Sequence, residues 1–275
     1  TRRSDHRSGN GYSKYGQIRC DQRSIRRGDR DDNLEGPRIK MNKAEVLSEL
    51  ESYGSAGIKK IYTNHGASEP FFGVKVADLK KILKKIKNDQ KLALELYQTG
   101  NSDAMYLAGL AADGAKMSVA ELQDWVEKAY WYMLSEYTVP WVASENENGW
   151  ELALKWIESK EERIASAGWA TIANIISVKE DAELDIAKLR SLLKRVESEI
   201  HSAQNRVRYT MNGYVIALAA FVLELSDEAL ESAKRIGKVE VNLGETACKV
   251  PFAPEYIEKI KARRTVGKKK KTAKC

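Results

Sequence analysis

The stretch 130–150 combines aromatic rings with carboxylates. It reads YWYMLSEYTVPWVASENENGW, and it places Trp131, Tyr132 and Trp141 close to Glu136 and Glu145. Aromatic side chains build apolar surface whereas carboxylates resist burial, so the two are interleaved at a helix boundary or around a pocket that handles positive charge. A carboxylate flanked by electron-rich rings can recognise a cationic base and stabilise positive charge that develops at a breaking bond.

Alkylated purines match this chemistry. Alkylation at N3 or N7 makes the base cationic and a better leaving group, so an enzyme has mainly to stabilise an oxocarbenium-like sugar and position a water. The competing interpretation is that the tryptophans pack in the core, since all six lie between Trp125 and Trp169. We assign Trp125, Trp156 and Trp169 to the core and take Trp131 and Trp141 as site candidates.

A second cluster lies at 205–214, with the sequence NRVRYTMNGY. Arg206 and Arg208 open a predicted helix that then presents Tyr209, Asn212 and Tyr214. These arginines could bind phosphate groups while Tyr214 faces the same groove. An equally good interpretation is structural, with each arginine paired to a nearby glutamate.

Other common chemistries lack their motifs. The chain has no GxxxxGK[ST] loop and no GxGxxG after a strand, so we expect no nucleotide cofactor. Its three histidines are scattered, and its three cysteines stand far apart, which argues against a metal site and a disulfide framework. We therefore expect a cytoplasmic monomer in a reducing compartment, with no cofactor. The chain contains no run of about 18 apolar residues, so no segment is predicted to span a membrane.

Positive charge is concentrated at the two ends of the chain. Residues 1–40 hold 11 Lys and Arg against 6 acidic residues, and residues 264–275 hold 6 with no acid. Removing these 17 basic and 6 acidic residues from the totals of 46 and 39 leaves 29 basic and 33 acidic residues for 41–263. We predict a disordered basic leader over 1–40, either a non-native addition before Met41 or an arm for nucleic acid, and a disordered basic tail over 264–275.

Between these ends, residues 41–263 predict helix after helix. The expected helices are 58–65, 90–97, 104–112, 119–134, 150–159, 161–177, 185–200, 207–225 and 227–236, with a possible strand at 239–243 and a last helix ending near Arg263. Apolar residues follow helical spacing, and Asn42 with Glu45 and Ser118 with Glu121 have capping-box spacing. Helix pairs of roughly 35 to 45 residues favour an all-α, HEAT-like superhelix with a concave face.

A stripe of lysines lies on one predicted helix within this domain. The segment 79–87, LKKILKKIK, places Lys80, Lys81 and Lys84 opposite its apolar face. A solvated helix face is one interpretation, and contact with DNA phosphates is the other.

The chain resembles the AlkD-type DNA alkylation repair proteins, the HEAT-like DNA glycosylase family, over roughly 41–263. The most specific stretch is EPFFGVKVADLKKI at 69–82, which is similar to the family's segment of aromatic residues, glycine and lysine before a basic helix. The order of helices and the aromatic middle support the match. The resemblance implies a curved superhelix that holds duplex DNA in its concave face and excises cationic 3- or 7-alkylpurines without a metal or cofactor.

The family's active site pairs an aromatic residue with an Asp one turn later. The resemblance places Trp131 or Tyr132 at the aromatic position and Glu136 at the acid, with Tyr214 as the second aromatic residue. Two departures stand out, since Glu replaces the expected Asp and Ser166 stands where an Arg is expected. Glu145 is the alternative acid.

These observations predict a protein that binds double-stranded DNA containing alkylated bases and hydrolyses their N-glycosidic bonds. Glu136 would be catalytic, Trp131, Tyr132, Trp141 and Tyr214 would contact the damaged nucleotide, and Lys80, Lys81, Lys84, Arg206 and Arg208 would bind phosphates. The rival hypothesis is a non-catalytic HEAT-like scaffold that binds DNA structures or a protein partner.

Overall fold

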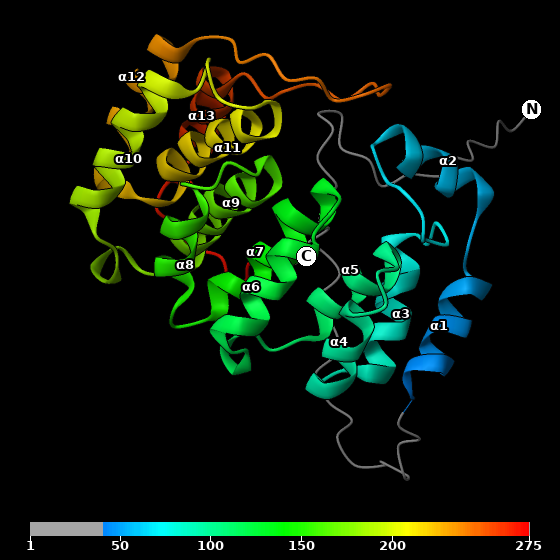
Figure 1. Ribbon diagram of the computed structural model, residues 1–275. Coiled ribbons are helices and arrows are strands. Elements are labelled where there is room, and N and C mark those ends of the chain that lie inside the picture. The colour runs from blue at the N-terminus through cyan, green and yellow to red at the C-terminus, as the bar shows by residue number, and fades with distance from the viewer. Residues whose placement is uncertain (1–40, 275) are drawn as a thin grey trace, which may run out of the picture.

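The computed structural model of the protein describes residues 41–274, and these form a curved all-α superhelix of the HEAT-like type (Figure 1). The predicted leader at 1–40 lies outside the described residues. The helices are α1 (Lys43–Ser52), α2 (Ala56–Asn64), α3 (Val76–Ile86), α4 (Gln90–Tyr97), α5 (Ser102–Ala111), α6 (Val119–Lys128), α7 (Val139–Glu145), α8 (Gly149–Trp156), α9 (Glu162–Val178), α10 (Ile186–Glu199), α11 (Asn205–Phe221), α12 (Ser226–Ile236) and α13 (Ala253–Ala262). Short 3-10 turns lie at η2 (Gly114–Lys116), η4 (Asp181–Glu183) and η5 (Leu223–Leu225), and a π-helical turn lies at η3 (Leu134–Thr138).

Local sequence signals define where several helices begin. Asn42 and Glu45 form a reciprocal capping box before α1, and Ser118 and Glu121 form another before α6. Such boxes satisfy two backbone N–H groups that have no partner inside the helix. Both predicted capping boxes are thus confirmed.

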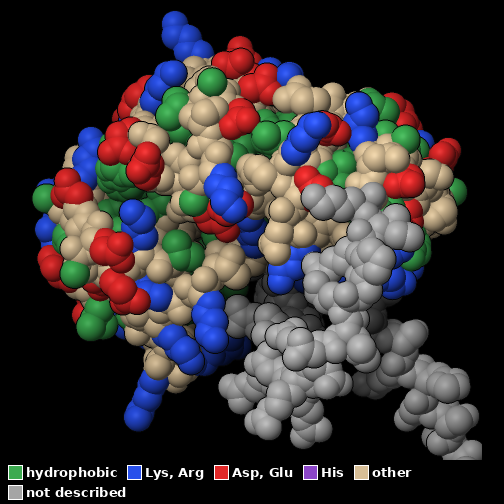
Figure 2. All heavy atoms as spheres, turned by 90° about the horizontal axis from the view of Figure 1, so that it is seen from below, with side chains coloured by type: hydrophobic (Ala, Val, Ile, Leu, Met, Phe, Trp, Pro, Cys, Tyr) green, Lys and Arg blue, Asp and Glu red, His purple; other side chains and the backbone are tan. Residues whose placement is uncertain are grey.

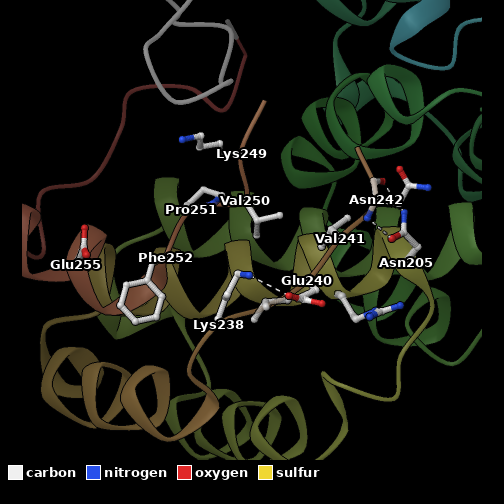
Figure 3. Close-up of a pocket in the computed structure, with 12 residues that line it drawn as sticks. Asn205, Lys238, Glu240, Val241, Asn242, Lys249, Val250, Pro251, Phe252 and Glu255 are labelled. Carbon is white, nitrogen blue, oxygen red and sulfur yellow. Dashed lines mark hydrogen bonds and ion pairs between the residues drawn. The ribbon is translucent and has the colours of Figure 1, made fainter. Parts of the chain in front are cut away.

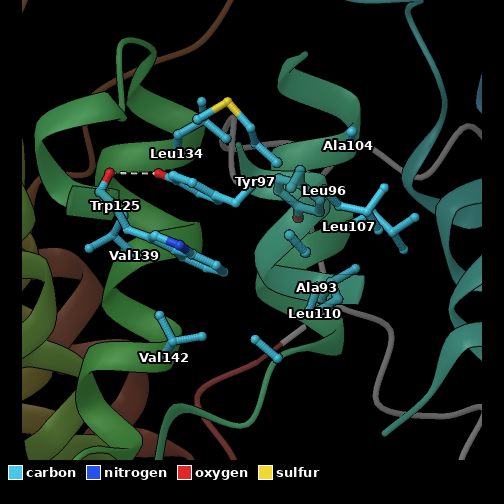
Figure 4. Packing of buried hydrophobic residues seen from close by; sticks show 14 of the residues in the cluster. Ala93, Leu96, Tyr97, Ala104, Leu107, Leu110, Trp125, Leu134, Val139 and Val142 are labelled. Carbon is cyan, nitrogen blue, oxygen red and sulfur yellow. Dashed lines mark hydrogen bonds between the residues drawn. The ribbon is translucent and has the colours of Figure 1, made fainter. Parts of the chain in front are cut away.

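Two adjoining hydrophobic clusters hold the superhelix together. The first is built mainly from buried side chains between α1 and α8 and reaches Ala167 of α9, and the second contains those from α8 to α13. In the first cluster, the Tyr97 ring stacks on Trp125 with centroids 3.8 Å apart, and its hydroxyl donates to the Trp125 carbonyl at 2.7 Å (Figure 4). In the second, α11 packs mainly against α9. The core assignments of Trp125, Trp156 and Trp169 are confirmed by their burial.

The helix expected over 119–134 is interrupted. It ends at Lys128, and the chain then enters the π-helical turn η3, which leads directly into α7. Pro140 stands near the start of α7, where it has no N–H to donate to a carbonyl one turn earlier. This irregular turn contains Glu136, and single π-helical turns often occur at functional sites.

The segment between α12 and α13 has an extended course without forming the expected strand at 239–243, and residues 41–274 contain no β-strand. It reaches from the end of α12 across to α2, as the orange trace in Figure 1 shows. Gly244 lies so close to α2 that an added Cβ would stand 2.8 Å from the Asn64 carbonyl oxygen, and its φ is +72°. We call residues 238–252 the bridging segment.

The C-terminal tail is packed rather than disordered over 264–274, contrary to the prediction. Lys269 Nζ lies 2.7 Å from an Asp181 oxygen and donates to the Ile176 carbonyl at 3.0 Å. Lys274 pairs with Glu145 at 2.9 Å and also donates to the Ala112 carbonyl. These lysines therefore hold the tail against both halves of the superhelix, and their side chains are only 8% and 16% exposed.

Candidate functional site

A buried pair of Glu136 and Arg206 forms the centre of the candidate site. Nε of Arg206 donates to one Glu136 carboxylate oxygen at 2.7 Å, and Nη2 donates to the other oxygen. The Glu136 side chain is 2% exposed and the Arg206 side chain 17%. Such a two-pronged contact fixes both groups and uses the planar geometry of each.

Two tyrosine rings complete the surroundings of Arg206. Its guanidinium lies 4.4 Å from the ring centre of Tyr132 and 4.5 Å from that of Tyr209. Tyr132 precedes Glu136 by four residues, and Tyr209 follows Arg206 by one helical turn, so each element supplies a ring and a charge. Cation–π contacts of this kind partly replace the water that the guanidinium loses on burial.

The protonation of the pair reflects two opposing effects. Burial raises the pKa of Glu136, and the charge of Arg206 opposes this rise. Burial by itself lowers the pKa of Arg206, but the Glu136 carboxylate outweighs it and the pKa of Arg206 is raised. Because a guanidinium does not lose its proton in proteins, the ionised pair is the state that this geometry stabilises at neutral pH.

A small aromatic pocket lies beside this pair. Its volume is about 60 Å³, and its walls include Tyr62, Trp131, Tyr132, Tyr137 and Tyr209. We call this space the aromatic pocket.

His65, at the end of α2, ties two of the pocket's rings in place. Nε1 of Trp131 donates to the His65 carbonyl at 2.8 Å, and the Tyr132 hydroxyl lies 3.1 Å from Nδ1 of His65. Burial lowers the pKa of His65, and the nearby charge of Arg206 lowers it further. His65 is therefore a neutral partner for Tyr132 at neutral pH.

The bridging segment covers the aromatic pocket. Leu243, Cys248 and Lys249 line it from this segment. Asn205 fixes the segment to the start of α11, because its side chain donates to the Asn242 carbonyl at 2.9 Å and accepts from the Asn242 N–H at 2.7 Å. Access to Glu136 from solvent is thus limited both by its pairing and by this cover.

The structure brings together four of the predicted site residues: Glu136, Trp131, Tyr132 and Arg206. Trp141 and Tyr214 do not join them, contrary to the prediction. Trp141 is 2% exposed and packs edge-on against Tyr106 with centroids 5.1 Å apart. Tyr214 is fully buried and donates to the Leu189 carbonyl at 2.7 Å.

Glu145, the alternative acid, and Ser166, which stands where the family has an Arg, also have structural roles. Glu145 accepts a hydrogen bond from the Gly114 N–H at 3.0 Å and pairs with Lys274. Ser166 is buried and donates to the Arg163 carbonyl of its own helix at 3.1 Å. Neither residue lines the aromatic pocket.

The predicted phosphate-binding residues fall into separate groups. Lys80, Lys81 and Lys84 lie on α3, where Lys81 already pairs with Asp78 at 2.7 Å. Arg206 is engaged by Glu136, whereas Arg208 lines a second and larger cavity. On the face shown in Figure 2, basic and acidic side chains are mixed over most of the surface.

Sequence reasoning did not assign His65 or the bridging segment to the site. His65 lies 67 residues from Tyr132 and makes its contact through the turn after α2, which no local spacing signals. Tyr209 could have been found, because it lies one turn after Arg206 on the same helix face.

Residues 41–274 contain no group of three or more His, Cys, Asp or Glu side chains placed to hold a metal ion. Within the same range, no helix has both the length and the apolar character needed to cross a bilayer.

Comparisons with known proteins agree with this architecture. The family model described as "DNA alkylation repair enzyme" matches residues 46–257. The uncharacterised proteins Lin0241 of Listeria innocua and Lmo0209 of Listeria monocytogenes are 35% and 34% identical over 225 residues, which cover 80% of this chain and 97% of each relative.

A solved structure is also similar, with 39% identity and a TM-score of 0.79 over 86% of this chain and all of the other. It is described as "A new family of proteins related to the HEAT-like repeat DNA glycosylases with affinity for branched DNA structures". With the match over 46–257, these similarities show that the chain belongs to the DNA alkylation repair enzyme family, as a divergent AlkD-like member.

Proposed function

We propose that this protein binds DNA, with a preference for branched structures, and does not excise bases. The observation that supports this proposal is the state of Glu136, whose two carboxylate oxygens both accept hydrogen bonds from Arg206. A carboxylate that stabilises an oxocarbenium-like sugar must face that sugar. Here the carboxylate faces a guanidinium, and its side chain is 2% exposed.

The aromatic pocket supports the same proposal. The bridging segment covers it, so an extruded purine could enter only if this segment moved. The similar solved structure is described as having affinity for branched DNA, which is the binding activity that we extend to this chain. Lys80 and Lys84 on α3 and Arg208 on α11 are our candidates for phosphate contacts.

Excision of alkylated purines is the second candidate function. It is favoured because Glu136 and Tyr132 both contact Arg206, and the Tyr132 ring packs edge-on against Trp131. This arrangement matches the pattern of an acid near aromatic rings. It would require Arg206 to release Glu136 and the bridging segment to move away.

One experiment compares the two functions. Binding of four-way junction and linear duplex of the same sequence is measured at several salt concentrations, and release of 7-methylguanine and 3-methyladenine is measured on alkylated duplex. A known alkylpurine glycosylase serves as the positive control for release. We expect tighter binding to the junction, a strong dependence on salt, and no release above the spontaneous rate.

The contrary result is equally clear. Base release by the wild-type protein, abolished in Glu136→Gln while DNA binding persists, would show that Glu136 is catalytic and that excision is the function. Equal affinity for junction and linear duplex would contradict the preference for branched structures.

A further inference from the structure

The bridging segment also lines a second cavity, which is larger than the aromatic pocket. Its volume is about 880 Å³, and it is lined by α11, the bridging segment and the start of α13 (Figure 3). The bridging segment contributes two limbs, the first at 238–242 and the second at 249–252. We call it the α11 cavity. Nothing in the proposed site uses it, although Lys249 borders both spaces.

One face of α11 builds the frame of this cavity. Asn205, Arg208 and Asn212 follow one another at spacings of three and four residues, so they share a face of the helix. Asn205 holds the first limb of the bridging segment through Asn242, and Asn212 holds the second limb by donating to the Pro251 carbonyl at 2.9 Å. The cavity is therefore a fixed gap between two anchored limbs.

Arg208 lies between these two anchors and lines the cavity. Its Nε is buried and has no hydrogen-bond partner among the described residues. Leaving a buried donor of a charged group unsatisfied is unfavourable, and a phosphate oxygen would satisfy it. Arg208 thus differs from Arg206, whose guanidinium is engaged by a carboxylate.

The charges around the cavity suit a single phosphodiester. Arg208, Lys238 and Lys249 are its basic lining residues, and Glu240 and Glu255 are its acidic ones. Glu240 pairs with Lys238 at 2.9 Å, and Glu255 pairs with Lys259 at 3.4 Å. The three basic residues outnumber the two acidic ones, so the lining carries a net positive charge.

Phe252 supplies an aromatic surface at the same cavity. Its side chain is 43% exposed and lines the cavity, so part of its ring is open to solvent there. Exposed aromatic rings beside cationic side chains form the sites at which proteins stack unpaired bases along a neutralised backbone. Paired bases in duplex DNA do not offer a free face for such stacking.

We propose that the α11 cavity binds an unpaired nucleotide of a DNA strand, with its phosphate at Arg208 and its base stacked on Phe252. This inference rests on the proposed DNA binding and adds a site for the single-stranded arm of a branched structure. An unpaired strand at a flap or an open junction supplies such a nucleotide, whereas a nicked duplex does not.

The test uses the full chain with two DNA probes. One is a duplex with an unpaired thymidine flap, and the other is the corresponding nicked duplex without the flap. Phe252→Ala and Arg208→Gln are compared with matched controls outside the cavity, Leu223→Ala for an exposed apolar residue and Lys194→Gln for an exposed basic residue. Circular dichroism verifies that all variants are folded.

We expect the wild-type protein to bind the flap more tightly than the nicked duplex. Phe252→Ala should weaken flap binding roughly tenfold and leave nicked-duplex binding unchanged. Arg208→Gln should also weaken flap binding and lower its salt slope by about one. Flap affinity equal to that of the wild type in both cavity variants overturns this inference while DNA binding stands, whereas failure of the wild type to bind any DNA overturns the proposed function as well.

Discussion

Arg206 and Arg208 stand two residues apart on α11 and face opposite surroundings. Arg206 enters the closed aromatic pocket, where Glu136 and two tyrosine rings engage it. Arg208 enters the open α11 cavity, where its Nε has no partner among residues 41–274. Residues two apart on a helix point in different directions, so neighbouring positions can have unrelated roles.

The role of a basic residue in this protein therefore depends on its partners. An arginine neutralised by a buried carboxylate stabilises the fold and offers little to DNA. An arginine without such a partner can bind a phosphate by giving up only water, which costs less free energy than giving up a carboxylate.

The largest expected effect is that of Arg206→Met on stability. Removing Arg206 leaves Glu136 buried without its ionic partner, which should lower the free energy of unfolding by about 3–5 kcal/mol. Arg208→Met removes no ion pair, so its effect should stay within about 0.5 kcal/mol. Urea denaturation followed by circular dichroism measures both values.

The double variant Glu136→Leu with Arg206→Met provides the control. It removes both charges together, so much of the stability lost in Arg206→Met should return. Similar losses for Arg206→Met and Arg208→Met would contradict the contrast between the two arginines.

The second prediction concerns pH in Arg206→Met. Burial already raises the pKa of Glu136 and Arg206 opposes that rise, so removing Arg206 should raise the pKa further. When the folded-state pKa of an acid lies above its unfolded value near 4.3, the protonated form favours folding and stability falls as pH rises through the folded pKa. The loss of unfolding free energy in Arg206→Met, relative to the wild type, should therefore be smaller at pH 5 than at pH 8. The difference should be about 1.4 kcal/mol for each unit by which the pKa of Glu136 rises between pH 5 and pH 8.

Denaturation curves at the two pH values measure this difference, with the double variant as the reference that lacks both groups. A deficit that does not change with pH would mean that Glu136 keeps its charge without Arg206.

The third prediction concerns Asn205, which holds the wall between the two spaces. Asn205→Ala removes two hydrogen bonds to Asn242. Each loss should lower the free energy of unfolding by about 1 kcal/mol. We expect faster hydrogen exchange over 239–243, because this limb would no longer be fixed to α11. Gln204→Ala is the neighbouring control, since Gln204 bonds the Lys160 carbonyl instead. Unchanged exchange in Asn205→Ala would show that other contacts hold the segment.

Most of the fold could be predicted from the sequence because its signals are local. Apolar spacing predicted both ends of α4 correctly, and the spacing of the capping residues predicted both capping boxes. The π-helical turn η3 was not predicted, because its departure from helical geometry depends on packing. The tail was wrongly expected to be disordered, since its lysines find Asp181 and Glu145 far away in the sequence.

The candidate site could be predicted in part, for the same reason. Tyr132 and Glu136 lie close together in the sequence, and their four-residue spacing indicated that they act together. Their pairing with Arg206 spans 70 residues, so the sequence left open whether that arginine meets a phosphate or a glutamate. Trp141 and Tyr214 face the core instead of the aromatic pocket, because an aromatic residue near an acid can point either way and spacing does not distinguish these directions.

The smallest expected effect extends the contrast between engaged and free cations to α3. Lys81 pairs with Asp78 at 2.7 Å, whereas the exposed Lys84 has no carboxylate at ion-pair distance within 41–274. If α3 contacts DNA phosphates, Lys84→Gln should lower the salt slope of duplex binding by about one. Lys81→Gln should lower it by less, because Asp78 already neutralises part of its charge. Since exposed ion pairs are worth at most about 1 kcal/mol, Lys81 can partly exchange Asp78 for a phosphate, and the two slopes should differ only modestly. Fluorescence anisotropy from about 50 to 200 mM salt resolves such slopes, and wild-type slopes in both variants would place the DNA contact away from α3.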